Sequence, residues 1–133
     1  MSPDLDKKLC EAFPLLYRDR HASMMETCMC WGFPGDGWFQ LIWDLSAKLE
    51  PMIRKWVNEN GMENAPHALQ VKEKYGLLCF YMSGETAEMS AAIDVAENMS
   101  AATCEDCSAP GRTRGTSWLS TQCDACASRA VPL

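Results

Sequence analysis

The stretch TCEDCSAPGRTRGTSWLSTQCDACAS, residues 103–128, decides how the end of this chain folds. It contains two Cys-x-x-Cys pairs fifteen residues apart, Cys104 with Cys107 and Cys123 with Cys126. Each pair can hold one ion with two sulfurs from a tight turn, and two such turns complete a tetrahedral site for Zn²⁺. The sequence therefore predicts a four-cysteine zinc site.

The contents of the spacer predict a β-hairpin between the two pairs. Pro110-Gly111 favours a turn, residues 112–114 form one arm, and residues 118–121 form the other. Four thiolates fill every position around Zn²⁺ and leave none for a reacting water, so the ion is expected to be structural. About 30 residues cannot bury enough surface alone, so the metal is expected to stabilise the segment strongly. Redox pairs, buried thiols and an iron–sulfur cluster remain alternatives.

Length and charge indicate one compact domain with a small appendage. The chain has 133 residues, of which 47% are hydrophobic, and a formal net charge of -6. Residues 85–106 contain six acids and no Lys or Arg, whereas arginines outnumber acids after residue 108. We predict a core domain over residues 1–103 and a zinc-binding module over residues 104–133. The net charge opposes long-range attraction to nucleic acid phosphates.

Two helices are predicted in the first half of the core. Residues 3–13 place apolar side chains at helical spacing before Pro14, and a second helix starts at Trp38 with Asp36 as its cap. At Pro51 this helix is expected either to kink or to restart, because proline lacks an amide hydrogen. Its predicted buried face comprises Trp38, Leu41, Ile42, Leu45 and Leu49.

The second half of the core predicts a β-hairpin followed by a helix. Residues 67–84 alternate in polarity around Tyr75-Gly76, and the second arm, residues 77–82, is apolar on both faces. Such an arm is expected to be covered on both sides or to lie at an interface. Residues 85–103 then form a helix, with Met89, Ala92, Ile93, Ala96 and Met99 on its apolar stripe. The expected fold is α+β: helices packed on a small antiparallel hairpin sheet, followed by a C-terminal zinc ribbon-like hairpin.

Thiols and histidines elsewhere offer weaker site candidates. A second metal site could be drawn from Cys28, Cys30, His21 and His67, but the spacing of the thiols favours core packing. Cys10 and Cys79 are also expected to be inert core thiols. The glycine-rich loop over residues 31–38 lacks the Lys-Ser/Thr ending of a phosphate loop and is expected to position the following helix. An enzyme using Cys28, Cys30 or His21 beside this loop remains a third hypothesis.

Trp118, Arg112 and Arg114 are the predicted partner-binding residues. An aromatic ring and arginines on a hairpin can anchor in a protein pocket or stack on a base. The alternative places Trp118 over the zinc knuckle and leaves the arginines solvated.

The chain resembles a family of small, mostly uncharacterised proteins encoded by bacteriophages and prophages. The matching pieces are WGFPGDGW (residues 31–38), VKEKYGLLCFYMSG (residues 71–84) and the terminal cysteine segment. Family members commonly have glycine where this chain has Ser108, and often arginine where it has Cys79. The resemblance implies an accessory protein that acts in the cytoplasm of an infected bacterium.

These observations lead to two main hypotheses. The first is a non-enzymatic binding protein that engages and inhibits a host protein complex, for example a CRISPR effector or another defence machine. The second is a zinc-ribbon regulator that binds nucleic acid through Trp118 and the arginines 112, 114 and 129. No apolar run approaches the roughly 20 residues that cross a bilayer, and the N-terminus lacks the apolar stretch of a signal peptide. A reducing cytoplasm, in which cysteines serve as thiols or metal ligands, is therefore expected.

Overall fold

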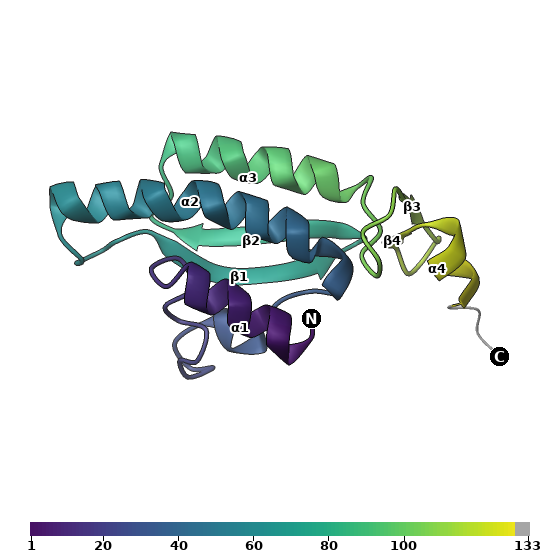
Figure 1. Cartoon of the computed structure of the whole chain (residues 1–133), viewed down its shortest axis with the longest axis horizontal. Helices are drawn as coiled ribbons and strands as arrows, with labels where there is room; N and C mark the ends of the chain where they lie inside the picture. Colours follow the sequence, from purple (N-terminus) through teal and green to yellow (C-terminus); the bar gives the residue numbers. More distant parts are fainter. Residues whose placement is uncertain (130–133) are drawn as a thin grey trace.

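The computed structural model describes residues 1–129 and has an α+β fold, as the sequence predicts. A two-stranded hairpin, β1 with β2, carries α2 and α3 on one side, and a smaller hairpin, β3 with β4, lies at one end with α4 (Figure 1). The elements in chain order are α1 (Pro3–Ala12), η1 (Cys28–Trp31), η2 (Asp36–Trp38), α2 (Phe39–Asn60), β1 (His67–Lys74), β2 (Leu77–Ser83), α3 (Ala87–Ser100), β3 (Arg112–Arg114), β4 (Ser120–Gln122) and α4 (Asp124–Arg129).

The helix α2 runs unbroken through Pro51, so the predicted restart does not occur. Proline removes the bond that the Ala47 carbonyl would have accepted, and Ala47 is exposed, where water can take that place. The predicted cap at Asp36 is wrong, because Asp36 begins the 3-10 turn η2 and α2 starts at Phe39. The Asp36 carboxylate instead accepts a hydrogen bond of 2.7 Å from the Ser2 amide at the start of α1.

The hairpin has the predicted turn but buries only one of its faces. Tyr75 and Gly76 both have positive φ, 54° and 80°, as a two-residue type I′ turn requires. Along β2, buried and more accessible side chains alternate, so the prediction of a strand covered on both sides is wrong within this chain. The inner face packs on α2 and α3 and consists of Ala68, Val71, Leu78, Phe80 and Met82.

Side chains of α3 cover the outer edge of β2. The Leu78 amide donates to the buried Ser100 hydroxyl at 3.0 Å, and the Phe80 amide donates to the Glu97 carboxylate at 3.0 Å. Ser100 thus takes the place on the buried stripe that the sequence assigned to Met99, which is 55% exposed. These two bonds satisfy strand amides that would otherwise be open to pairing with another chain.

The hydrophobic core lies between the inner face of the hairpin, the apolar side of α2, α3 and the N-terminal helix α1. Trp38, Leu41, Ile42, Leu45 and Leu49 are all buried, which confirms the predicted face of α2. No helix within residues 1–129 combines the length and the apolar character needed to span a membrane.

Candidate metal centre

The structure brings the four predicted cysteines together. The sulfur atoms of Cys104, Cys107, Cys123 and Cys126 all lie within 4.8 Å of one another, and those of Cys107 and Cys123 are 3.6 Å apart. A tetrahedron with metal–sulfur bonds of about 2.3 Å has edges of about 3.8 Å, so four thiolates at these positions fit one Zn²⁺ after small adjustments. Within residues 1–129, no other group of three or more His, Cys, Asp or Glu side chains has its ligand atoms close enough to share one ion.

Backbone amides and one arginine surround the sulfurs. The Cys126 amide donates to the Cys123 sulfur at 3.4 Å, and this bond is the main reason that the pKa of Cys123 falls to about 7. The Arg129 guanidinium donates to the Cys126 sulfur at 3.1 Å. At Cys126, however, burial and the neighbouring sulfurs outweigh this bond and raise the pKa to about 12, so metal binding must displace the proton from that thiol.

The hairpin between the two cysteine pairs forms as predicted and occupies one of its arginines. In β3 and β4, Thr113 pairs with Thr121. The Arg114 guanidinium donates to the Gln122 carbonyl at 3.0 Å and to the Asp124 carboxylate at 2.6 Å. This contact lowers the pKa of Asp124. Arg114 therefore binds the residues on either side of Cys123 and is not a free side chain in solvent.

The glycine-rich loop of the core holds the first cysteine pair. The Gly37 amide donates to the Glu105 carbonyl at 2.9 Å, and the Trp38 indole donates to the Thr103 carbonyl at 2.8 Å. A side chain at position 35 or 37 would collide with this backbone: a Cβ on Gly35 would lie 2.6 Å from the Glu105 oxygen. The two glycines thus allow close contact between the loop and the metal centre.

Ser108 adds a side-chain bond to the same contact. Its φ of 73° lies in the left-handed region that favours glycine, so serine here carries backbone strain. Its hydroxyl donates to the Gly37 carbonyl at 2.5 Å. A glycine at this position would relieve the strain and lose the bond.

The tip of the first hairpin contacts the second hairpin. Thr121, which is fully buried, donates its hydroxyl to the Gly76 carbonyl at 2.5 Å and shares a 2.9 Å bond with the Thr113 hydroxyl. The Thr121 carbonyl accepts a bond from the Glu105 amide at 2.9 Å. The cysteine-rich segment therefore packs on two loops of the core. The predicted boundary at residue 103 stays a prediction, and residues 130–133 of the predicted module lie outside the described residues.

The weaker thiol and histidine candidates are not brought together as a ligand set. Cys28 is exposed and Cys30 is half-buried, so the prediction of core packing is wrong for Cys28. Its 3-10 turn, η1, buries only Met29. His21 is exposed, whereas His67 is held between the Asp19 carboxylate at 3.0 Å and the Arg18 guanidinium at 2.9 Å.

The other two thiols are half-buried rather than enclosed in the core. Cys10 donates to the Asp6 carboxylate at 3.6 Å, and burial, with the charge of Asp6, raises the pKa of this thiol to about 12. Cys79 lies on the outer face of β2. Because the thiolate is the nucleophilic form, a thiol with the raised pKa of Cys10 is a poor nucleophile at neutral pH. This agrees with the predicted inert role of Cys10.

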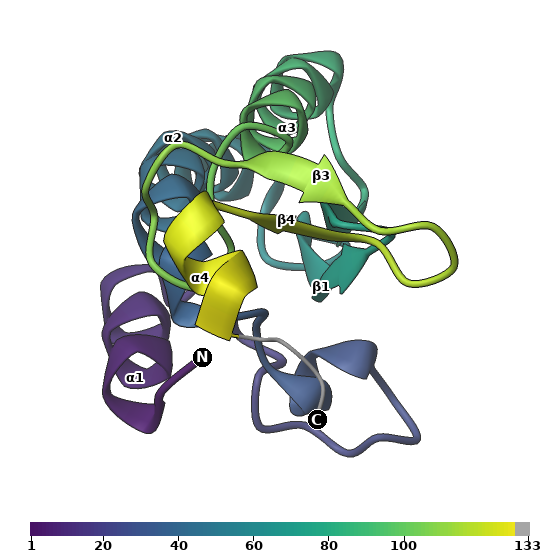
Figure 2. The same cartoon turned by 90° about the vertical axis from the view of Figure 1, so that its right-hand side faces the viewer.

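Trp118 does not cover the metal centre. It lies in the loop between β3 and β4 with 82% of its surface exposed, so the alternative placement over the zinc knuckle is wrong. Figure 2 shows this loop projecting from the body of the molecule. Arg112 is also exposed, on the first strand of the same hairpin.

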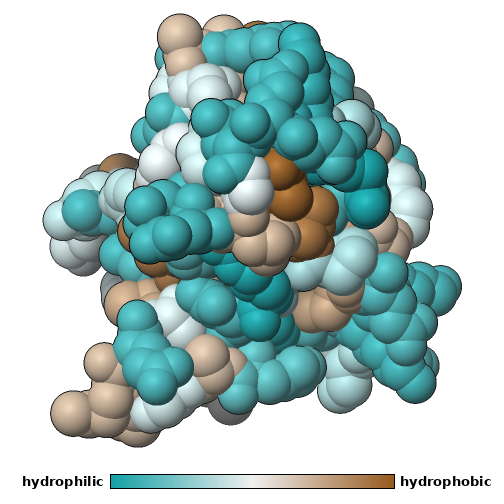
Figure 3. Space-filling view, turned by 90° about the vertical axis from the view of Figure 1, so that its left-hand side faces the viewer, coloured by the Kyte–Doolittle hydropathy of each residue, from teal (hydrophilic) through white to brown (hydrophobic). Residues whose placement is uncertain are grey.

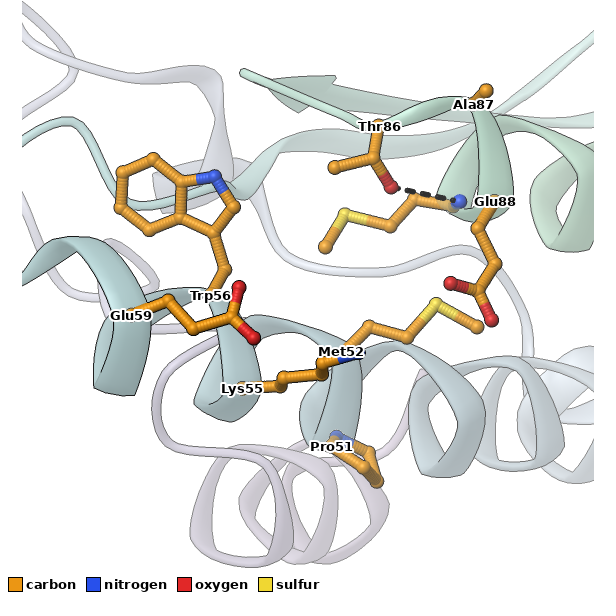
Figure 4. Close-up of a pocket in the computed structure, with 9 residues that line it drawn as sticks. Pro51, Met52, Lys55, Trp56, Glu59, Thr86, Ala87 and Glu88 are labelled. Atoms are coloured by element: carbon orange, nitrogen blue, oxygen red, sulfur yellow. Dashed lines mark hydrogen bonds between the residues drawn. The ribbon is translucent and has the colours of Figure 1, made fainter.

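A groove lies at the opposite end of the molecule, where α2 ends and α3 begins. Its volume is about 520 Å³, and Met52 and Trp56 contribute apolar surface beside charged residues (Figure 4). Hydrophobic residues form a small patch ringed by hydrophilic ones on this end (Figure 3). The Thr86 hydroxyl in the groove already accepts the Met89 amide as the cap of α3. The lining residues offer a surface for contact rather than a paired nucleophile and base.

Sequence reasoning missed several polar side chains that hold the core together. The Glu50 carboxylate, buried in α2, accepts the amides of Leu15 and Leu16 at 2.7 and 3.2 Å. Glu97 and Ser100 bind the edge of β2 in the same way. Nothing in the local sequence distinguishes these residues from ordinary polar positions, because their partners are 17 to 35 residues away.

Comparison with known proteins gives no relative: no protein-family model, no curated protein and no solved structure matches this chain.

Proposed function

We propose that this chain is a non-enzymatic binding protein whose C-terminal segment folds around one structural Zn²⁺. Four thiolates with tetrahedral spacing are the ligand set typical of structural zinc, and softer sulfur ligands disfavour Mg²⁺ and Ca²⁺. The metal would link β3, β4 and α4 to the Gly35 to Trp38 loop. Its proposed role is to hold a small hairpin in a fixed position on the core.

The observation that carries the binding role is the exposure of Trp118. Trp118 is 82% exposed, so its ring gains little of the free energy that burial of an indole provides. Aromatic residues of this kind are frequent anchors in protein interfaces. Arg112 lies exposed on the same hairpin and can add a charged contact at the rim. The proposed partner is therefore a protein with an apolar pocket that accepts the indole ring.

The identity of the partner is proposed from the phage-protein resemblance alone. A host protein complex in the bacterial cytoplasm is the proposed target, and inhibition of a defence complex, such as a CRISPR effector, is the proposed outcome. The acidic charge of the chain suits a protein partner better than a nucleic acid.

The arrangement of the arginines speaks against the alternative of a ribbon that binds nucleic acid. Arg114 is paired with Asp124, and Arg129 donates to a cysteine sulfur. Of the three arginines on which that hypothesis depends, two are thus engaged within the module. We do not propose the ribbon hairpin as a nucleic acid site.

A capture experiment with a matched variant tests the binding proposal. Wild-type protein and Trp118→Ala, both reduced and with one zinc per chain, are immobilised and exposed to a bacterial host lysate. A protein retained by the wild type and lost from the variant is expected. Equal retention by both proteins would contradict a role for Trp118, and the absence of any specific partner would contradict the proposal as a whole.

A thiol-labelling experiment addresses the enzyme hypothesis. At neutral pH, an iodoacetamide probe is expected to modify the exposed Cys28 slowly, as an ordinary thiol, and to leave Cys10 unmodified. Labelling of Cys28 or Cys30 much faster than a free thiol peptide would reveal an activated nucleophile and support catalysis instead.

A further inference from the structure

The outer face of the first hairpin is a second exposed surface with a distinct composition. In the register of β1 and β2, directly opposite residues point to the same side of the sheet. The helices α2 and α3 pack on the inner face, so this outer side is left open (Figures 1 and 2). Its opposed pairs are Gln70 with Tyr81, Lys72 with Cys79 and Lys74 with Leu77.

Apolar and aromatic side chains on this face are unusually accessible. Tyr81 is 44% exposed, Leu77 is 40% exposed, and Tyr75 in the adjoining turn is 69% exposed. A sheet face that carries aromatic and aliphatic side chains is ordinarily covered by another layer. Apolar side chains that gather on one exposed face are a common feature of binding sites.

Each of the two tyrosines has a lysine over its ring. The Lys72 ammonium lies 5.8 Å from the centre of the Tyr81 ring, and the Lys74 ammonium lies 5.7 Å from the centre of the Tyr75 ring. A positive charge beside an exposed ring is the pairing by which proteins bind single-stranded nucleic acid: the ring stacks on a base and the lysine neutralises the phosphate.

Some acidic residues of the chain lie on the opposite side of the sheet, and others border this face. Glu88 and Asp94 are exposed on α3, which packs against the other side of the sheet. The Glu73 carboxylate accepts the Gly76 amide at 3.1 Å and is occupied within the turn. Glu26 does lie at the margin, where it lines a groove with Tyr81. Glu97 of α3 also borders the face next to Tyr81, where it accepts the Phe80 amide. The positive charge of the face itself therefore comes from Lys72 and Lys74, and the carboxylates lie at its borders.

A groove beside Tyr81 can receive a flat ring. Its volume is about 560 Å³, and Met24, Met25 and Leu69 contribute to its walls together with the connector that precedes η1. The two methionines are 65% and 89% exposed. Because methionine side chains are flexible and polarizable, they can close over bases of different shapes without sequence preference.

We propose that this outer face binds single-stranded nucleic acid. Tyr81 and Tyr75 stack on bases, while Lys72 and Lys74 contact the phosphates. The site is separate from Trp118, so it goes beyond the function proposed above and can fail or succeed independently of it.

Fluorescence anisotropy with labelled oligo-dT and oligo-U tests the site on the full, zinc-loaded chain. Binding is expected to weaken with salt, with a slope of about -1.4 in log K against log salt for two phosphate contacts. Tyr81→Ala is expected to weaken binding roughly 5- to 150-fold, the range for loss of one stacked base. Tyr81→Phe keeps the ring and should retain binding.

Matched control variants distinguish binding at this face from binding elsewhere on the surface. The double variant Lys72→Ala, Lys74→Ala is expected to remove most of the salt dependence, whereas Lys48→Ala on the exposed side of α2 and Trp118→Ala should bind as the wild type does. Binding that is absent at low salt, or unchanged in both the Tyr81→Ala and the double-lysine variants, would overturn the proposal. So would sedimentation showing that the face instead joins two copies of the chain, with Tyr81→Ala yielding monomers.

Discussion

Replacing Gly37 with alanine should separate the core from the cysteine cluster. The Gly37 amide donates to the Glu105 carbonyl at 2.9 Å, and a Cβ at this position would overlap the backbone from Cys104 to Asp106, lying 2.6 Å from the Asp106 nitrogen. Every atom it meets is backbone, so no side chain can rotate away. The loop and the first cysteine pair must therefore move apart.

The cost of this movement can be worked from the contacts. Forcing a methyl group into a packed contact costs about 3 kcal/mol, at the upper end of the usual range because rigid backbone is involved. Loss of the bond to Glu105 adds about 1 kcal/mol. A total of about 4 kcal/mol should lower the melting temperature of a chain of this size by about 10 °C or more.

Thermal melting of the reduced, zinc-loaded protein checks this, together with competition for zinc against a chromophoric chelator. If metal binding and docking are coupled, Gly37→Ala should also weaken zinc binding. Gly61→Ala is the matched control: its φ is 85°, but nothing lies within 4 Å of the added Cβ. The control should lose about 1–3 kcal/mol from backbone strain, because its φ of 85° and ψ of 176° are essentially restricted to glycine, and it should keep its zinc affinity. A Gly37→Ala protein no less stable than the Gly61→Ala protein would refute the docking argument.

Three further predictions concern the metal, Ser108 and Glu97. Removing zinc with a chelator should lower the melting temperature and expose the amides of β3 and β4 to hydrogen exchange. A structural zinc site would be contradicted if the reduced protein held less than one metal equivalent per chain, or if chelation left its melting temperature unchanged. Ser108→Ala should cost about 1 kcal/mol in denaturant unfolding, because it loses the bond to Gly37 and keeps the strain, whereas Ser108→Gly should be nearly neutral; equal stability of all three proteins would show that the bond contributes nothing. Burial raises the pKa of Glu97 in the folded protein, although the Phe80 amide donates to its carboxylate. The folded state therefore holds this proton more tightly than the unfolded state does, and stability falls as the pH rises from the unfolded-state pKa of Glu97 to its folded-state pKa. The melting temperature of Glu97→Gln relative to wild type should therefore be higher at pH 7 than at pH 4, and a difference independent of pH would count against this assignment.

The helices and hairpins were predictable because their signals are local. Apolar spacing located α1, α2 and α3, and Tyr75-Gly76 located the turn between β1 and β2. The errors arose where distant residues decided the outcome. Asp36 binds the start of α1 rather than capping α2, and Met99 is displaced from the core because Ser100 binds the Leu78 amide.

The sequence was least informative about the exposed surfaces. The apolar run of β2 indicated a covered strand, but alternation along the strand buries one face and leaves Tyr81 and Leu77 accessible. Periodicity shows which side chains share a face, but it does not show whether another element will cover that face. Coverage depends on how many layers the chain can supply, and here α2 and α3 pack on the same side.

The spacing of the four cysteines was enough to predict the cysteine cluster, because each tight turn places two sulfurs side by side and a single ion needs only two such turns. The tertiary structure alone decided what the centre rests on. Gly35, Gly37 and the indole of Trp38 lie more than sixty residues before the first cysteine pair, yet they form the surface on which it packs. A glycine in the sequence shows that a position has no side chain. Only the folded structure shows that the backbone of residues 104–106 packs against Gly35 and Gly37.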